Sequence, residues 1–408
     1  MNLSENKKNF DYDPDSKKFI ILFMTVQFLG FFYYNGMRVI FPIFLQYSGF
    51  SQNQVIADWA TIFGIGLFLG SMTRYPVGIL VDKLTRNQSI FFSISLLVIS
   101  TIIINFTTDV FILSLVFAVI RTGTHVPPLL GRGYVNETDR KKQGKVNGYL
   151  FVSANIGGII APILFTFLFD ISLVTMVIVN NILLISLLIF YYFYIPPKKI
   201  KKNYPLIEFV RTSLTELFSK FKRVIVLFII LGLVNGVILY LQVPYALYIL
   251  GLTTNETGTI VGLITLGNTI FIFFAGSLTD KLGVRQTIYG GFLLVILGSF
   301  IQIINMSNIW FFFISQLTIS NGVVFVVNGL TTNVTLQSKK ETAASMFGGT
   351  STFFFFGSSL IPGVASMLYI QDPSLPFWLM IGISLLVFPF GLLINGRMDK
   401  SKIYSYIE

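Results

Sequence analysis

The sequence predicts an all-α integral membrane protein with twelve transmembrane helices. Of its 408 residues, 54% are hydrophobic and only 12% are charged, whereas soluble proteins carry about 25% charged residues. Apolar runs long enough to cross a bilayer as helices, about 18 to 25 residues each, recur along the whole chain. With no cysteine and one histidine, the chain is not expected to hold a structural metal, and we expect no cofactor.

Twelve such apolar runs can be delimited. They cover residues 19–46, 54–80, 88–106, 110–131, 146–169, 172–195, 224–250, 257–279, 286–305, 309–331, 343–369 and 375–395. The first eighteen residues are polar and include Asp11, Asp13 and Asp15. No signal peptide is therefore expected before the first run.

Lysine and arginine lie almost entirely on one side of these runs. Of the 29 basic residues, 26 fall in the terminal segments and in the loops that follow even-numbered runs, and the opposite loops carry only acids such as Asp109 and Glu256. By the positive-inside rule, both termini are cytoplasmic, in a multi-pass protein of the cell membrane. The net charge of +11 then reflects membrane topology, so lipid is an expected partner and nucleic acid is not.

One long polar segment divides the chain. Between Pro196 and Arg223, basic residues alternate with apolar ones at helical spacing, which predicts a cytoplasmic linker with an amphipathic helix on the membrane surface. The predicted domains are a six-helix bundle over residues 1–195, this linker over 196–223, and a second six-helix bundle over 224–408.

The two predicted bundles repeat one another at an offset close to 200 residues. Asn35-Gly36 recurs as Asn235-Gly236, Gly157 and Pro162 recur as Gly357 and Pro362, and the segment from Gly78 to Leu84 recurs from Gly276 to Leu282. We therefore expect two pseudo-symmetric bundles, with a binding site near the membrane midplane between them.

The repeated segment carries a family resemblance. Residues 74–86, with Gly78, Asp82 and Arg86, resemble the G-x-L-x-D-R-x-G-R-R loop of the major facilitator superfamily of secondary transporters, with Lys83 and Thr85 replacing Arg and Gly. In that family the loop is a latch that holds the two halves together. The resemblance implies gating roles for Arg74, Gly78, Asp82, Arg86, Gly276, Asp280 and Arg285. For Asp82 and Arg86 the alternative is an ordinary solvated turn, and for Arg74 it is contact with substrate.

Two further segments resemble family motifs in part. Arg121 begins an R-x-x-x-G-x-G pattern in which His125 and Pro127 replace the glycines. Residues 154–162 resemble the G-x-x-x-G-P motif of antiporters in this superfamily, which favours export. The alternative for this segment is close packing of helices at small residues, which implies no transport direction.

Ionisable residues inside the runs are functional candidates, because an unpaired charge in a bilayer is costly. They are Arg38, Asp58, Arg74, Arg121 and His125, all in the first half. Arg38 shares a helical face with Tyr34 and Asn35, and it either contacts substrate or forms an ion pair with Asp58. His125 titrates in the range from about pH 5 to 8 when unperturbed, so His125 and Asp58 are the candidate proton carriers, and a hydrogen-bonded packing role for His125 stays open.

The second half supplies uncharged polar residues instead. The predicted substrate-binding residues are Tyr34, Asn35, Arg38, Arg121, His125, Asn155, Asn235, Gln242 and Asn321. Together with the resemblance, they predict a monomeric secondary transporter, and not an enzyme, that moves a small organic solute by alternating access with protons as the coupling ion. Export of amphiphilic or drug-like compounds is the favoured activity, and the alternative is uptake or facilitated transport of a small organic anion.

Overall fold

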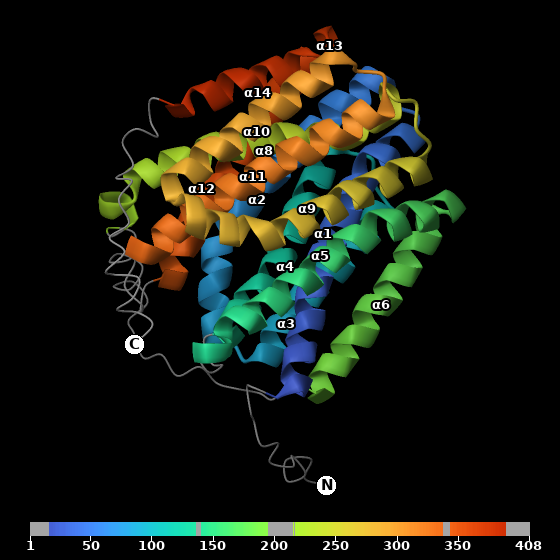
Figure 1. Cartoon of the computed structure of the whole chain (residues 1–408). Helices are drawn as coiled ribbons and strands as arrows, with labels where there is room; N and C mark the ends of the chain where they lie inside the picture. Colours follow the sequence, from blue (N-terminus) through green and yellow to red (C-terminus); the bar gives the residue numbers. More distant parts are fainter. Residues whose placement is uncertain (1–15, 136–139, 195–214, 216, 338–342, 389–408) are drawn as a thin grey trace.

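The structure, a computed structural model, describes residues 16–135, 140–194, 215, 217–337 and 343–388. This part of the chain is built of thirteen α-helices, and no strand occurs in it (Figure 1). In chain order they are α1 (Lys17–Tyr47), α2 (Gln52–Lys83), α3 (Arg86–Ile104), α4 (Val110–Val135), α5 (Arg140–Ile171), α6 (Leu173–Tyr194), α8 (Lys222–Tyr248), α9 (Thr254–Leu282), α10 (Val284–Ile304), α11 (Ile309–Gln337), α12 (Ala343–Leu360), α13 (Pro362–Gln371) and α14 (Leu375–Leu385).

The prediction of an all-α membrane protein is confirmed. Ten helical stretches of the described chain are long and apolar enough to cross a membrane, and α9 and the short α14 are not among them. The predicted run 343–369 is divided into α12 and α13 just before Pro362, because proline cannot continue the hydrogen-bond ladder of a helix. The count of twelve spans and the cytoplasmic termini stay predictions, and the predicted linker helix lies largely outside the described residues.

The same helix pairs pack in each half of the chain. In the first half α1 packs on α5, α2 and α3 on α4, and α3 on α6. In the second half the corresponding pairs are α8 with α12, α9 and α10 with α11, and α10 with α14. The two bundles meet where α5 packs against α9 and where α2 packs against α12 and α13.

Repeated glycines explain how the equivalent pairs come so close. A Cβ atom on Gly157 of α5 would collide with the carbonyl oxygen of Phe28 in α1. A Cβ atom on Gly357 of α12 would collide in the same way with the carbonyl oxygen of Ile229 in α8. This repeated pair of the sequence therefore marks one helix–helix contact that is built twice.

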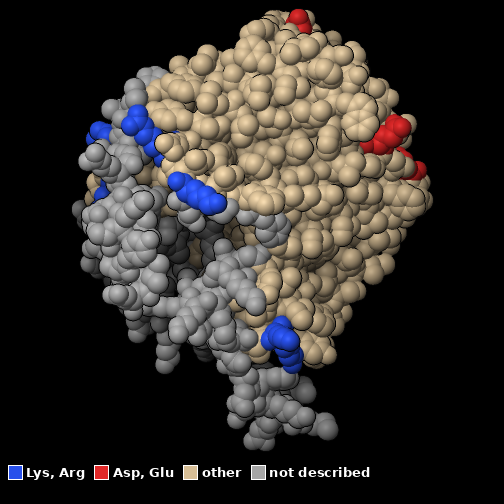
Figure 2. Space-filling view, viewed as in Figure 1, with Lys and Arg blue, Asp and Glu red and all other residues tan. Residues whose placement is uncertain are grey.

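The two ends of the molecule differ in charge. Figure 2 shows lysine and arginine beside the segments drawn in grey and the acidic residues at the opposite edge. We call the end at which α1 and α8 begin, with Lys17 and Lys222, the basic end, and the end at which α5 ends and α9 begins, with Asp170 and Glu256, the acidic end. The basic end is the predicted cytoplasmic side.

Gly157→Ala and Gly357→Ala should each destabilise the protein by about 1 to 3 kcal/mol, because an added methyl group must push two backbones apart. Thermal unfolding of the purified protein in detergent measures this effect. Gly363→Ala in α13 is the matched control, since nothing lies within 4 Å of its added Cβ. Equal melting temperatures for all three variants would contradict the packing role.

Candidate functional site: a central cavity and its closure

A cavity of about 450 Å³ lies between the two bundles. Its walls come from α1, α2, α4 and α5 of the first bundle and from α8, α11 and α12 of the second. The lining residues, from Gln27 in α1 to Phe355 in α12, lie near the middle of their helices or between it and the basic end. A volume of this size lies in the range of small-molecule sites, about 300 to 1,000 Å³.

The first bundle contributes two guanidinium groups to the cavity. Arg121 of α4 lies over the ring of Tyr34 with its Cζ atom 4.0 Å from the ring centroid, and over the ring of Phe355 at 4.6 Å. Arg74 of α2 lies over the same Phe355 ring at 4.9 Å. Such cation–π contacts are favourable, and more so where water is scarce. Phe355 therefore forms an aromatic platform through which the second bundle contacts both cations.

His125 lies one helical turn from Arg121 and is also buried. Its Nε2 atom is 3.0 Å from the carbonyl oxygen of Gly70 in α2. Because a carbonyl oxygen only accepts hydrogen bonds, Nε2 carries a proton, and Nδ1 is the acceptor of the neutral ring. This bond connects α4 to α2 and fixes the orientation of the imidazole.

The second bundle contributes a neutral wall. It consists of Phe228, Val327, Thr331, Ser351, Phe354 and Phe355. No aspartate or glutamate occurs among the described residues that line the cavity. The cavity is therefore positive on one side and apolar on the other, an arrangement that attracts anions.

The predicted substrate-binding residues fall into two groups. Tyr34, Arg121 and His125 line the cavity, together with Arg74, which was predicted to take part in gating. The amide nitrogens of Asn35 and Asn155 instead donate to carbonyl groups of their own helices.

The remaining predicted polar residues lie away from the cavity lining. Asn235 donates to Ser358 of α12 over 3.4 Å, and Oδ1 of Asn321 is buried with no partner among the described residues. Nη2 of Arg38 donates to Oε1 of Gln242 over 3.1 Å. No ion pair joins Arg38 to the half-buried Asp58 in this conformation.

The repeated loops differ in how they turn. At the start of α3, Thr85 forms a capping box with Gln88, whereas Gly283 of the second copy lies between α9 and α10 with φ of 85°. A left-handed conformation of this kind favours glycine, which explains why only the second copy keeps it. Arg86 is buried, with its guanidinium over the ring of Phe23 at 5.4 Å.

The structure describes fewer contacts for the other gating candidates. Gly78 lies within α2, and the Arg285 guanidinium lies over the ring of Tyr289 at 5.6 Å. The side chains of Asp82 and Asp280, and Gly276 beyond its backbone, lie outside what the structure describes. The latch pairing of Asp82 with Arg86 therefore stays a prediction.

Toward the acidic end, hydrogen bonds between the bundles close the path beyond the cavity. Trp59 Nε1 in α2 donates to the carbonyl oxygen of Tyr240 in α8 over 3.1 Å, and the Tyr240 hydroxyl donates to the carbonyl oxygen of Ile56 over 2.8 Å. Pro244 has no N–H, so the Tyr240 carbonyl has lost its donor within the helix. Together with the bond from Arg38 to Gln242, we call these contacts the clasp.

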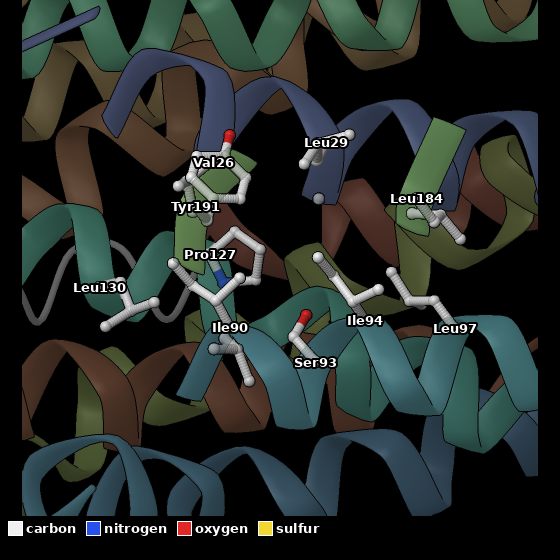
Figure 3. Close-up of a pocket in the computed structure, with 12 residues that line it drawn as sticks. Val26, Leu29, Ile90, Ser93, Ile94, Leu97, Pro127, Leu130, Leu184 and Tyr191 are labelled. Atoms are coloured by element: carbon white, nitrogen blue, oxygen red, sulfur yellow. The ribbon is translucent and has the colours of Figure 1, made fainter. Parts of the chain in front are cut away.

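A much smaller void lies inside the first bundle (Figure 3). It is lined mostly by aliphatic side chains of α1, α3, α4 and α6, and its volume is about 10 Å³. That volume holds at most about one water molecule. It is a packing gap and not a substrate site.

Sequence reasoning missed two residues that organise this region. Phe355 stood in a run of four phenylalanines whose orientation the sequence does not give. Trp59 was not singled out, although Pro244 signals a carbonyl in need of a donor four residues earlier.

Trp59→Phe should lower the free energy of unfolding by about 1 to 3 kcal/mol, because it leaves the buried Tyr240 carbonyl without a donor. In a Pro244→Ala background the helix supplies that donor again, so the same substitution should cost clearly less. Chemical denaturation of the four proteins in this double-mutant cycle measures the coupling free energy between the two positions. The loss of indole packing occurs in both backgrounds, so it cancels from that coupling. Strictly additive effects would contradict this account of the clasp.

Comparison with known proteins relates the second half of the chain to a family. A family model described as Major Facilitator Superfamily matches residues 224–403. The chain is 25% identical over 186 residues to the quinolone resistance protein NorA of Staphylococcus aureus strain N315. That alignment covers 46% of this chain and 46% of NorA, so the matched region spans about half the length of this relative.

Solved structures match over most of the chain. The nucleoside transporter NupG superposes with a TM-score of 0.74 at 15% identity, covering 92% of this chain and 100% of that one. A bacterial homologue of the lysosomal transporter Spinster, inward-facing and unoccupied, gives 0.72 at 12% identity over 92% and 95% of the two chains. A POT family transporter in complex with 5-aminolevulinic acid gives 0.71 at 15% identity over 92% and 96%. At these identities the structures show a shared fold. The family model matches the second half of the chain, and that half is similar to the Major Facilitator Superfamily.

Proposed function

We propose that this protein is a monomeric secondary transporter that moves a small organic solute across the cell membrane by alternating access. One observation carries the proposal: a cavity of ligand size lies between the bundles, and hydrogen bonds that cross from one bundle to the other close its acidic side. Rocking of the bundles would break these bonds and open the cavity toward the acidic end.

The cargo we propose first is an amphiphilic or drug-like compound, and the direction is export. The phenylalanine-rich wall supports an apolar body on the cargo. The similarity to NorA, a quinolone resistance protein by name, supports export. Protons are the proposed coupling ion, with His125 in the cavity wall and Asp58 near the acidic end as the proposed carriers.

A second candidate is transport of a small organic anion. It is favoured by Arg74 and Arg121, which place two positive charges in the cavity wall, with no acidic residue among the described lining residues. The two candidates share an apolar body and differ in the charge of the cargo. A cation would meet repulsion in this cavity.

Alternating access can be tested with single-cysteine reporters, because the chain has no cysteine of its own. Ala60 is buried in α2, one turn from Ile56 on the same helical face. Ala60→Cys should react slowly with a membrane-impermeant maleimide, and several-fold faster once Trp59→Phe and Tyr240→Phe weaken the clasp. The exposed Ser51→Cys is the control for access from the outer side. No reaction at position 60 in the weakened protein would contradict alternating access.

The charge of the cargo can be tested with Arg121→Gln. Loss of a charge-assisted contact should slow naphthoate transport in proteoliposomes by about 10- to 100-fold, and leave ethidium efflux unchanged or faster. Arg223→Gln, an exposed arginine at the basic end, is the matched control. Unchanged naphthoate transport in Arg121→Gln would contradict the anion candidate, and transport without any response to an imposed pH gradient would contradict proton coupling.

A further inference from the structure

Arg38 is a further buried cation, and it does not line the cavity. Arg38 of α1 is only 2% exposed. Its Nη2 atom donates to Gln242, while Nε and Nη1 are buried with no hydrogen-bond partner among the described residues. A buried guanidinium without an acidic partner is costly, so packing alone does not account for Arg38.

The position of Arg38 relates it to the cavity. It lies one turn beyond Tyr34 on α1, about 6 Å farther along the helix axis toward the acidic end. The Arg121 guanidinium lies over the ring of that same Tyr34. The two cations therefore flank Tyr34, one in the cavity wall and one beyond its closed end.

The group that covers Arg38 belongs to the other bundle and carries no charge. Gln242 offers one amide oxygen to a guanidinium that has five N–H donors. Gln242 is on α8, two residues from Tyr240, whose bonds to α2 form the rest of the clasp. When the bundles part at the acidic end, one movement of α8 away from the first bundle removes all these contacts.

We propose that Arg38 is a second anion subsite, which binds the carboxylate of an aromatic or otherwise apolar cargo once the clasp opens. This inference rests on the proposed function. In the closed state Gln242 holds Nη2, the nitrogen that both bidentate edges of a guanidinium share, and its departure frees both edges for a carboxylate. The anionic group then passes from Arg121 to Arg38 over one helical turn, so no long stretch of membrane is crossed without a cation.

The test measures binding of naphthoate and of its neutral counterpart naphthamide to the purified full chain by calorimetry. Variants at position 38 are made in the wild-type protein and in the clasp-weakened Trp59→Phe/Tyr240→Phe protein. In the clasp-weakened protein, Arg38→Gln should reduce naphthoate affinity by about 10- to 100-fold and leave naphthamide affinity unchanged. Arg38→Lys should retain part of the affinity, and Arg223→Gln all of it. In the wild-type protein, Arg121→Gln should matter more than Arg38→Gln.

Three outcomes would overturn the subsite. In the first, Arg38→Gln lowers the affinity for naphthoate and for naphthamide equally, which indicates a structural role. In the second, Arg38→Gln does not lower the affinity for naphthoate in the clasp-weakened protein. In the third, Asp58→Asn lowers the naphthoate affinity as much as Arg38→Gln does, which indicates that Arg38 pairs with Asp58 in the open state. Labelling of Ala60→Cys separates the two levels of the argument. If position 60 never reacts, alternating access fails and the subsite fails with it. If position 60 reacts and naphthoate binding does not depend on Arg38, only the subsite fails.

Discussion

Inside a bilayer every backbone carbonyl must find its donor within the protein, because the hydrocarbon offers none. Each proline in a helix leaves the carbonyl four residues earlier without a hydrogen-bond donor in that helix, so another group must supply the donor. In α4, Pro127 frees the carbonyl of Gly123, which accepts from Ser93 of the same bundle over 2.8 Å. In α8, Pro244 frees the carbonyl of Tyr240, which accepts from Trp59 of the other bundle. The same requirement thus joins helices within a bundle and across the interface between the bundles.

Charge is distributed unequally between the two bundles. The cations described within the spans belong to the first bundle, and the second bundle covers them with neutral groups, Phe355 over Arg74 and Arg121 and Gln242 over Arg38. In the alternating access that we propose, movement of the second bundle would change which cation is accessible without carrying a described charged side chain through the hydrocarbon. Such a movement would avoid the large cost of moving an ion through a low dielectric. In this proposal the neutral second bundle moves, and the cations of the first bundle stay in place.

The sequence could predict what depends on periodicity and composition. The lengths of the apolar runs gave the helices, and the repeated Gly157 and Gly357 pointed to equivalent close contacts, because only glycine allows backbones to approach so far. It could not say which of residues 353–356 faces the cavity, because consecutive residues of a helix point about 100° apart and four of them face all sides. Nor could it pair Trp59 with Tyr240. Pro244 indicates that the Tyr240 carbonyl lacks a donor within its helix, but not which distant side chain donates to it. The spacing of Arg38 to Tyr34 predicted the helical face on which Arg38 lies. It could not predict the hydrogen-bond partner Gln242, which belongs to another helix.

The repeat itself shows which features packing requires and which set the cargo. Glycines at the helix contacts recur at an offset of 200 residues, but the charges do not: Arg121 corresponds to Asn321, His125 to Phe325 and Arg38 to Ile238. If the cations served only to hold each bundle together, the second bundle, which packs the same helix pairs, would need them too. It folds without them. The reason for retaining costly guanidinium groups in the first bundle therefore lies outside the packing of a bundle. The anionic cargo that we propose would supply it, as a group of opposite charge that binds transiently between the two halves.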